Sequence, residues 1–352
     1  MATSFHTLVV LLCSLVLMSC SPDREANVNG SGSSSGGGPG ALRISVIPKG
    51  TTHDFWKSVH AGAIKAEQEI NAVAESNNLP KVTVIWKGPQ KEDDRSQQIQ
   101  VVQNFIASGV NGIVLAPLDD TALLPPVQAS MKAKIPVAII DSALKGEVGK
   151  DFISYISTDN YKGGVLGAKR LGEVLGGKGR VILLRYQEGS ASTMQRERGF
   201  LETVGKEFPN IDMISADLYG GATVESARQK AENLLTRFRD RVDGIFCPNE
   251  STTFGMLRAL TDAGLIGKVR FVGFDASEAL VEAMRKKTIQ GLVLQNPIRM
   301  GYLGVKAMYD HLRGAPVVPQ FDTGAVLVTP GTMDEPEMKL LHSPDLSPWL
   351  GD

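Results

Sequence analysis

Short apolar runs alternate with longer amphipathic stretches along the chain from Ala41 onward. Runs such as Gly112–Ala116 and Pro136–Ile140 are almost continuously apolar, which is typical of parallel strands covered by helices on both faces. The runs expected to form strands are Arg43–Ile47, Val82–Trp86, Gly112–Ala116, Pro136–Ile140, Phe152–Ile156, Arg180–Leu184, Asp212–Ala216, Gly244–Cys247, Val269–Gly273 and Gly291–Leu294. The stretches expected to form helices are Asp54–Glu75, Arg95–Ser108, Tyr161–Leu175, Thr193–Glu207, Thr223–Arg237, Thr252–Ala263 and Pro297–Leu312. Strand and helix alternating in this order predict a doubly wound α/β architecture.

The number of expected strands is too large for one compact sheet of this kind, and 352 residues exceed one typical hydrophobic core. We therefore expect two α/β domains. The hydrophobic share of 42% and the charged share of 21% are ordinary for a soluble globular protein. A formal net charge of -1 does not favour nucleic-acid binding, which needs a basic domain or stripe.

The N-terminus carries the features of an export signal rather than of a folded domain. Leu8–Met18 is an apolar run that is short for a membrane span and suitable for a signal peptide. The following Leu17-Met18-Ser19-Cys20 resembles a bacterial lipobox, so we expect residues 1–19 to be cleaved and Cys20 to carry lipid. Residues 20–40 are rich in Gly and Ser and predict a flexible tether. No Lys or Arg precedes the apolar run, and an uncleaved anchor or a non-functional apolar tail stays an alternative.

The chain has no set of cysteines for a disulfide framework. Cys13 lies in the expected signal peptide and Cys20 is the expected lipidation site, which leaves Cys247 alone. Cys247 ends an apolar run, so we expect it to act as a small buried hydrophobic residue.

Polar residues follow several of the predicted strands directly. Open α/β sheets bind ligands at the carboxyl ends of their strands, so these positions are candidates for a common site. The candidates are Asp141, Asn249, Asp275 and Gln295, together with His53, Phe55 and Trp56 after the first strand. Carboxylates and amides bond to hydroxyl groups and aromatic rings cover apolar faces, a combination that suits a sugar. Taken singly, each has another explanation: Asp275 as a helix cap, the aromatic pair as core, and the two amides as turn residues.

At this point the sequence resembles the ribose/galactose-type periplasmic sugar-binding proteins from about Leu42 to about Val328. The segments that carry the resemblance are RISVIPKGTTHDFWKSVHAGAIKAE, IPVAIIDS with YISTDNYKGG, TMQRERGF, FCPNEST, FVGFDAS and VLQNP. The resemblance implies the type I periplasmic binding protein fold, in which a hinge of three chain crossings joins two doubly wound parallel-sheet domains. The crossings are expected near Ser157–Asp159, Gln295–Asn296 and Thr323–Ala325. They divide the chain into an N-terminal lobe of residues 41–158 and 296–324 and a C-terminal lobe of residues 159–295 and 325–345.

The resemblance also implies roles for individual residues. Phe55 and Trp56 are expected to stack on the ligand, with a third apolar contact from Leu218 or Tyr219. Asp141, Asn249 and Asp275 are expected to take or share the protons of ligand hydroxyls, and Arg196 and Gln295 are expected to donate to ligand hydroxyls. Arg198 competes with Arg196, but only Arg196 has the family's spacing to Gly199-Phe200; its alternative role is a surface ion pair with a nearby Glu.

Two positions depart from the family pattern. Ser142 stands where pentose-binding members commonly have Arg, and His53 stands where Asn is usual, so we expect a hexose, a sugar alcohol or another polyol rather than ribose. His53 also suggests pH-sensitive binding. The expected partners are a sugar or polyol and an ABC-type membrane permease, for a monomer in the periplasm or cell envelope with no cofactor and no metal.

Three other functions share some of these sequence features. Paired carboxylates can hydrolyse glycosides, but Asp141 and Asp275 lie among amide donors, and the chain has no P-loop, G-x-G-x-x-G or H-E-x-x-H motif. Glu92-Asp93-Asp94 is more typical of a solvated face than of a metal site, and His53 with His60 is a weak metal pair. A repressor of this fold needs a basic DNA-binding segment ahead of the first strand, where this chain has a signal and a tether. A periplasmic receptor for a sensor or chemotaxis system stays open, because it uses the same site with another partner.

Overall fold

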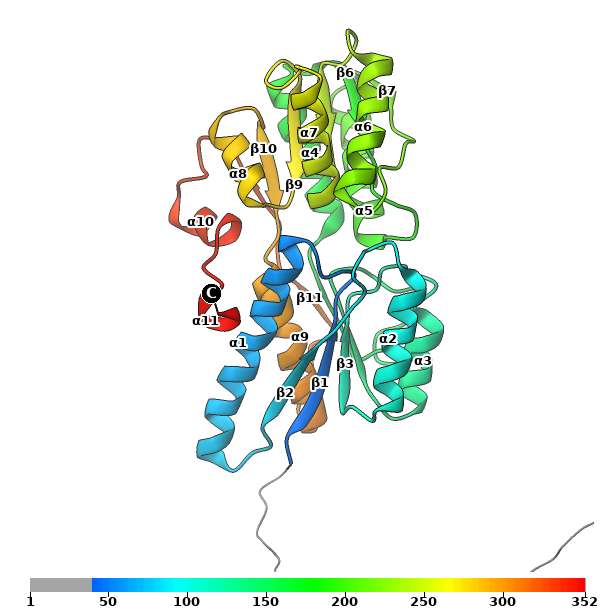
Figure 1. Ribbon diagram of the computed structural model, residues 1–352, viewed down its shortest axis with the longest axis vertical. Helices are drawn as coiled ribbons and strands as arrows, with labels where there is room; N and C mark the ends of the chain where they lie inside the picture. The colour runs from blue at the N-terminus through cyan, green and yellow to red at the C-terminus, as the bar shows by residue number, and fades with distance from the viewer. Residues whose placement is uncertain (1–39, 352) are drawn as a thin grey trace, which may run out of the picture. The chain divides into compact units, whose positions relative to one another are not determined.

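Two six-stranded sheets, each covered by helices on both faces, make up the folded part of the chain (Figure 1). The computed structural model describes residues 40–351, which belong to one compact unit. The predicted signal peptide, Cys20 and all but the last residue of the predicted tether lie outside the described residues.

The first sheet forms the centre of what we call the N-terminal lobe. Its strands lie in the order β11 (Gln320–Asp322), β5 (Ser154–Ser157), β4 (Val137–Ile140), β3 (Gly112–Leu115), β1 (Leu42–Ile47) and β2 (Val82–Trp86). All its pairs are parallel. Helices α1 (Asp54–Asn77) and α9 (Pro297–Leu312) pack on one face, and α2 (Arg95–Ala107) and α3 (Leu124–Lys132) pack on the other.

The second sheet forms the centre of the C-terminal lobe. Its strands lie in the order β12 (Val326–Val328), β10 (Gly291–Leu294), β9 (Arg270–Phe274), β8 (Gly244–Phe246), β6 (Lys178–Leu183) and β7 (Asn210–Ser215). Helices α6 (Val224–Phe238), α7 (Glu250–Asp262) and α8 (Glu278–Arg285) cover one face, and α4 (Asn160–Val174) and α5 (Ala191–Glu207) cover the other. The pairing is parallel except between β10 and β12, which is antiparallel.

The chain passes between the lobes at three places, as the fold prediction required. These are the link from β5 to α4, the link from β10 to α9 and the link from β11 to β12. The predicted fold class is confirmed. The sequence pattern missed α3, α8, β11, β12 and the two C-terminal helices, α10 (Pro336–His342) and α11 (Ser347–Leu350). Helix α3 begins Leu124-Pro125-Pro126, and prolines that suit the first turn of a helix also resemble a loop signal.

Helix α5, which carries Arg196, packs closely against α4. A Cβ atom added to Gly199 of α5 would lie 2.2 Å from the Tyr161 carbonyl oxygen of α4, and one added to Gly164 of α4 would lie 1.9 Å from the Arg196 carbonyl oxygen. Glycine at both positions therefore lets the two backbones touch. The Gly in the Arg-x-x-Gly-Phe motif is explained by this packing.

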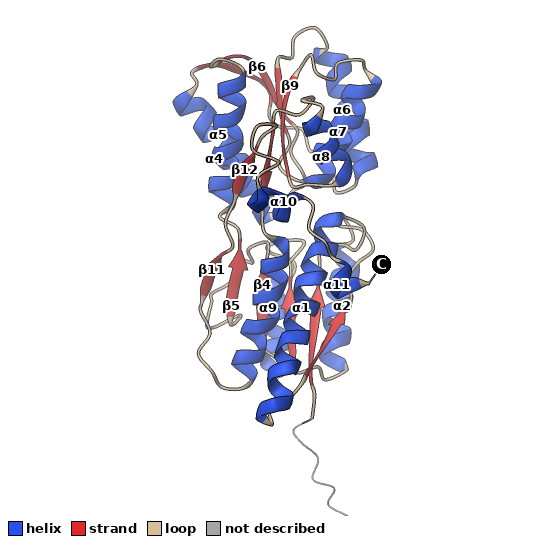
Figure 2. Ribbon diagram, turned by 90° about the vertical axis from the view of Figure 1, so that its left-hand side faces the viewer, coloured by secondary structure: helices blue, strands red, loops and turns tan. Residues whose placement is uncertain are grey.

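The C-terminal segment contacts both lobes (Figures 1 and 2). Helix α10 (Pro336–His342) follows Met333, which is buried in the core of the C-terminal lobe, and partly buried apolar residues of α10 pack against the same core. Helix α11 (Ser347–Leu350) lies beside α1, where the Trp349 ring centre is 5.8 Å from the Lys65 ammonium. Among the helices of residues 40–351, none combines the length and the apolar character needed to span a membrane.

Candidate functional site

A cavity lies between the lobes, where the carboxyl ends of strands from both sheets face each other. The N-terminal lobe contributes Lys49, His53, Phe55, Trp56, Glu92 and Asp141 to its lining. The C-terminal lobe contributes Tyr186, Ser192, Thr193, Arg196, Asn249, Glu250, Asp275 and Gln295. The strand-end rule therefore locates a small polar cavity, of about 30 Å³, between the two sheets.

The structure brings most of the sequence-predicted residues to this cavity. Its lining includes His53, Phe55, Trp56, Asp141, Arg196, Asn249, Asp275 and Gln295. Ser142 is buried behind it, and its hydroxyl accepts a hydrogen bond from the Ser192 amide across the lobes at 3.1 Å. Leu218 packs against the core of the C-terminal lobe, and the Tyr219 ring centre lies 4.7 Å from the Arg185 guanidinium. Neither lines the cavity, so the structure does not bring the residues predicted for a third apolar contact together with the others.

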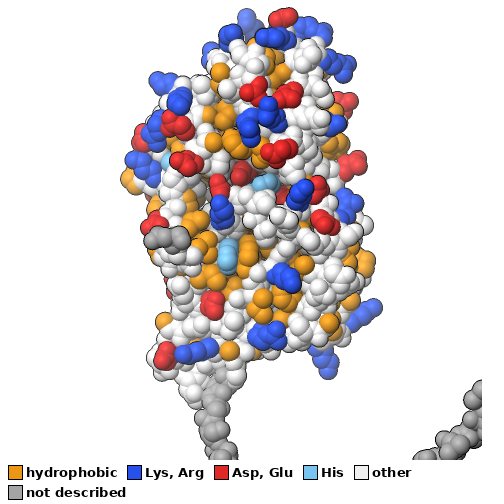
Figure 3. Space-filling model, viewed as in Figure 1, with side chains coloured by type: hydrophobic (Ala, Val, Ile, Leu, Met, Phe, Trp, Pro, Cys, Tyr) orange, Lys and Arg blue, Asp and Glu red, His pale blue; other side chains and the backbone are white. Residues whose placement is uncertain are grey.

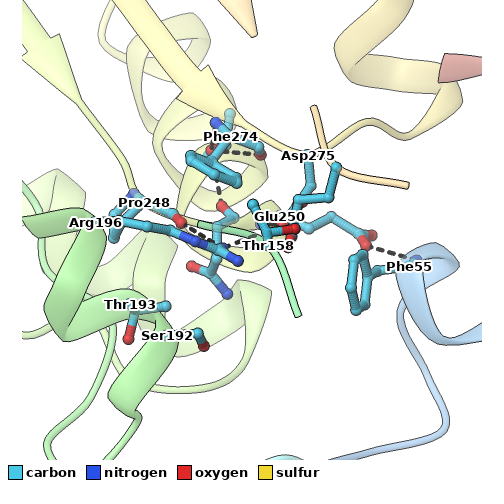
Figure 4. Close-up of polar contacts among 12 residues, drawn as sticks. Phe55, Thr158, Ser192, Thr193, Arg196, Pro248, Glu250, Phe274 and Asp275 are labelled. Atoms are coloured by element: carbon cyan, nitrogen blue, oxygen red, sulfur yellow. Dashed lines mark hydrogen bonds and ion pairs between the residues drawn. The ribbon is translucent and has the colours of Figure 1, made fainter. Parts of the chain in front are cut away.

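Arg196 lies at the centre of the C-terminal side of the cavity (Figure 4). Its side chain is 2% exposed, donates to Asn160 Oδ1 at 2.8 Å and to the Pro248 carbonyl at 3.0 Å, and covers the Phe274 ring at 3.9 Å. Its Nη1 lies 3.9 Å from Asp275 Oδ2. Burial lowers the pKa of the guanidinium, which neighbouring carboxylates counteract. The alternative of a surface ion pair is wrong for Arg196; Arg198, which is exposed and near Glu202, has that role.

Nη2 of Arg196 has no hydrogen-bond partner among the described residues, although it is buried. Oε1 of Gln295 is in the same state. The other end of the Gln295 amide donates to Asp275 Oδ1 at 2.7 Å, which fixes its orientation. On the C-terminal side of the cavity, one buried donor and one buried acceptor are therefore left over. On the N-terminal side, Asp141 Oδ2 is likewise buried without a hydrogen bond among the described residues, although the Lys49 ammonium lies 2.8 Å away.

The two strand-end aspartates adopt the same unusual backbone conformation in the two lobes. Asp141 follows β4 with φ 62° and Asp275 follows β9 with φ 65°. Asp tolerates this left-handed region better than most residues. Asp275 does not cap α8, whose N-cap is Ser277; its Oδ2 accepts from the Glu250 amide at 3.2 Å, and burial raises the pKa of its carboxyl.

The Asp141 carboxylate has a cation that the sequence did not indicate. Lys49, which follows β1, is 4% exposed, and its Nζ lies 2.8 Å from Asp141 Oδ2 and 3.1 Å from Ser192 Oγ. A residue that follows β1 therefore supplies the cation beside the carboxylate that follows β4.

Glu92 was expected on a solvated face, and this expectation is wrong. Its side chain is buried and accepts hydrogen bonds from His53 Nδ1 at 2.6 Å, Trp56 Nε1 at 2.5 Å and the Tyr186 hydroxyl. Burial alone would raise the pKa of Glu92, but His53, Lys49 and Tyr186 outweigh it and hold the pKa well below its usual range. Burial likewise opposes the charged form of His53, yet Glu92 raises the pKa of the imidazole overall, so the two side chains form an ion pair.

The aromatic pair supplies the apolar wall of the cavity. Phe55 is 9% and Trp56 is 3% exposed, and their rings meet edge to face with centres 4.9 Å apart. Both also belong to the core of the N-terminal lobe, so the core explanation is correct, and their place in the cavity lining leaves the predicted ligand contact a prediction. Asn249 likewise has two structural roles. It lines the cavity, and its side chain caps α7 by accepting a hydrogen bond from the Thr252 amide at 3.4 Å.

Comparison with known proteins gives consistent relatives. A family model described as "Periplasmic binding protein domain" matches residues 44–316. The chain is 25% identical over 295 residues to the D-ribose/D-allose-binding protein of Pseudomonas aeruginosa, covering 83% of this chain and 88% of that protein. It is 26% identical over 232 residues to the xylitol-binding protein of Mycolicibacterium smegmatis, covering 66% of this chain and 63% of that protein. An ABC transporter solute binding protein from Agrobacterium vitis with bound D-fucose superposes with a TM-score of 0.78 at 31% identity, covering 85% of this chain and 99% of that one.

Proposed function

Because the chain belongs to the family of periplasmic binding protein domains, we propose that it captures a sugar or related polyol between its lobes and delivers it to an ABC-type permease. The named relatives are binding proteins of this kind rather than enzymes. The ligand would contact both lobes at once and favour their closed arrangement.

One observation carries the proposal: Arg196 Nη2 and Gln295 Oε1 are buried in the lining of one cavity without partners in the described part of the chain. A buried polar atom without a partner costs about 1–3 kcal/mol. A hydroxyl group accepts and donates, so neighbouring hydroxyls on a ligand satisfy both atoms. Phe55 and Trp56 offer apolar surface for the C–H face of the same ligand.

The charges of the cavity favour a neutral ligand. Lys49 pairs with Asp141, His53 pairs with Glu92, and Arg196 lies near Asp275. The remaining carboxylate, that of Glu250, accepts from two backbone N–H groups. An amino acid or an organic anion would need a free opposite charge, which this arrangement does not offer. On the face shown in Figure 3, charged side chains of both signs are interspersed, so this face does not form a basic surface for nucleic acid either.

The roles proposed for the ligand-binding residues follow from this arrangement. Arg196 donates to a ligand hydroxyl. The protons of the ligand hydroxyls are shared with four further residues, Asp141, Asn249, Asp275 and Gln295. Ser142 and His53 make contacts within the protein, to Ser192 and Glu92, so we propose that they act on the ligand by shaping the cavity. A hexose, a sugar alcohol or another polyol remains our proposal for the ligand class.

We further propose that the chain is exported, that Cys20 carries the lipid anchor, and that the protein acts as a monomer in the periplasm or cell envelope. The lobe boundaries proposed from the sequence are residues 41–158 with 296–324, and residues 159–295 with 325–345. A receptor for a sensor or chemotaxis system would use the same cavity. Loss of uptake of the identified ligand after gene deletion supports transport, and intact uptake with loss of the response supports sensing.

A thermal-shift panel of pentoses, hexoses, sugar alcohols, amino acids and sugar acids tests the proposed function. A ligand at 100 times its Kd stabilises the folded protein by about 2.7 kcal/mol, which appears as a higher Tm. We expect a neutral polyhydroxylated compound to raise the Tm. A response to an amino acid or a sugar acid, with none to any sugar or polyol, contradicts the proposal.

A further inference from the structure

Glu250 reaches from one lobe to the other. It is the first residue of α7 in the C-terminal lobe, and its carboxylate accepts hydrogen bonds from the Phe55 amide at 3.0 Å and the Asp54 amide at 3.3 Å (Figure 4). Both amides belong to the first turn of α1 in the N-terminal lobe. The Glu250 side chain is buried, so this contact is not a loose surface interaction.

Helix α1 has no cap of its own. The N-cap residue His53 makes no side-chain cap bond, because its imidazole is bonded to Glu92 at 2.6 Å. The first amides of a helix need acceptors, and a carboxyl oxygen can serve as one. Glu250 supplies that acceptor from the other lobe.

We propose that Glu250 is a positioning residue that caps α1 only while the lobes are closed, and that this cap holds Phe55 in place against the ligand. The inference rests on the proposed function, because it requires the lobes to separate when the ligand leaves. Separation would expose the Phe55 and Asp54 amides and the Glu250 carboxylate to water together. Closure around the ligand would therefore also fix the position of Phe55, through the cap that Glu250 provides.

The surroundings of Glu250 make the cap sensitive to pH. Burial, more than any other cause, raises the pKa of its carboxyl to about 7. The nearby carboxylates of Asp275 and Asp54 raise this pKa further, whereas His53 and the Phe55 amide lower it. In separated lobes the exposed carboxyl returns towards its ordinary value of 4.5. Closure then takes up a proton, so Glu250 favours ligand binding most below pH 4.5, and this contribution is lost as the pH rises through about 7.

Measurements of Kd by calorimetry on the purified protein test the inference with three variants. Glu250→Ala removes the cap, and we expect Kd at pH 5 to rise about tenfold or more. Glu250→Gln keeps an acceptor without a titrating group, so the rise in Kd between pH 4.5 and 7 should be smaller than in the wild type. Glu278→Ala is the matched control, because Glu278 is also the first residue of a helix in the C-terminal lobe, but is exposed and outside the cavity. We expect its Kd to match the wild type.

The Tm separates a closure role from a structural one. Glu250→Ala should leave the Tm of the ligand-free protein unchanged and lower only the Tm of the ligand-bound protein. Equal losses of Tm with and without ligand, or a Kd equal to that of Glu278→Ala, overturn the inference while the proposed function stands. A wild-type protein that binds no sugar or polyol contradicts the proposed function instead. Hydrogen exchange of the Phe55 amide, measured with ligand bound, tests the cap directly. Slower exchange in the wild type than in Glu250→Ala supports the inference, and equal exchange in the two proteins overturns it.

Discussion

Arg196→Met is the sharpest perturbation of the site, because Arg196 is both part of the buried structure and a source of a free donor. Methionine has a comparable length and no charge. The change removes the hydrogen bonds to Asn160 Oδ1 at 2.8 Å and to the Pro248 carbonyl at 3.0 Å. It also removes the cation 3.9 Å from Asp275 Oδ2. Removing one partner of a buried ion pair costs about 3–5 kcal/mol.

Two measurable effects follow from this loss. For a domain of roughly this size each kcal/mol lowers the Tm by about 2–4 °C, so we expect the ligand-free Tm to fall by roughly 6–20 °C. Without Nη2, the ligand loses one charge-assisted hydrogen bond of about 1.5–3 kcal/mol, which raises Kd about 10- to 100-fold. Differential scanning calorimetry with and without the ligand found by the panel measures both effects.

Arg198→Met is the control on the same helix. Arg198 has a side chain that is 60% exposed and lies 3.9 Å from Glu202, and exposed ion pairs contribute about 0–1 kcal/mol. We expect this variant to keep nearly the wild-type Tm and Kd. If the two variants lower the Tm equally, or if Arg196→Met binds ligand as the wild type does, the role assigned to Arg196 is wrong.

The remaining predictions concern the supports of the site. Glu92→Gln should lower the Tm most between pH 4.5 and 6.5, because the folded state lowers the pKa of Glu92 to about 2 and raises the pKa of His53 to about 9. The Tm is measured against pH for both proteins, and the difference in Tm between the variant and the wild type should become smaller below pH 4.5 and above pH 6.5. Gly199→Ala places a Cβ atom 2.2 Å from a backbone carbonyl of α4 and should cost about 1–3 kcal/mol in urea unfolding, whereas Gly205→Ala, which meets nothing within 4 Å on the same helix, should not destabilise. The Cys247 thiol, which is buried and whose pKa burial raises well above its usual value, should react with a thiol reagent only on unfolding; reaction in the native protein would contradict its packing.

The strand-end rule explains how much of the site could be predicted from the sequence. Asp141, Asn249, Asp275 and Gln295 each follow an apolar run, and the carboxyl ends of parallel strands meet at one edge of a sheet. Local pattern therefore gave both the fold and the place of these side chains. Whether each touches a ligand stays a prediction for the binding experiments.

The residues that the sequence did not reveal belong to contacts between distant segments. Glu92 stands in the charged run Lys91–Arg95, which resembles a solvated turn. It is buried because His53 and Tyr186, 39 and 94 positions away in the chain, supply its donors. Lys49 and Glu250 likewise gain their roles from partners on other strands or on the other lobe. Composition and periodicity report only on the local environment, so they carry no signal for such pairs.

The contacts between the lobes bear on how a ligand would close the protein. The Tyr186 hydroxyl bonds to Glu92 across the lobes, and the Gly189 carbonyl accepts from the Asp120 amide at 2.9 Å, so the closed arrangement has protein–protein bonds of its own. The unpaired atoms of Arg196 and Gln295 are buried in the same arrangement and destabilise it. A ligand shifts an equilibrium only by its differential affinity for the two states. A polyol that pairs these two atoms relieves this cost in the closed arrangement, so we expect its binding energy to favour closure.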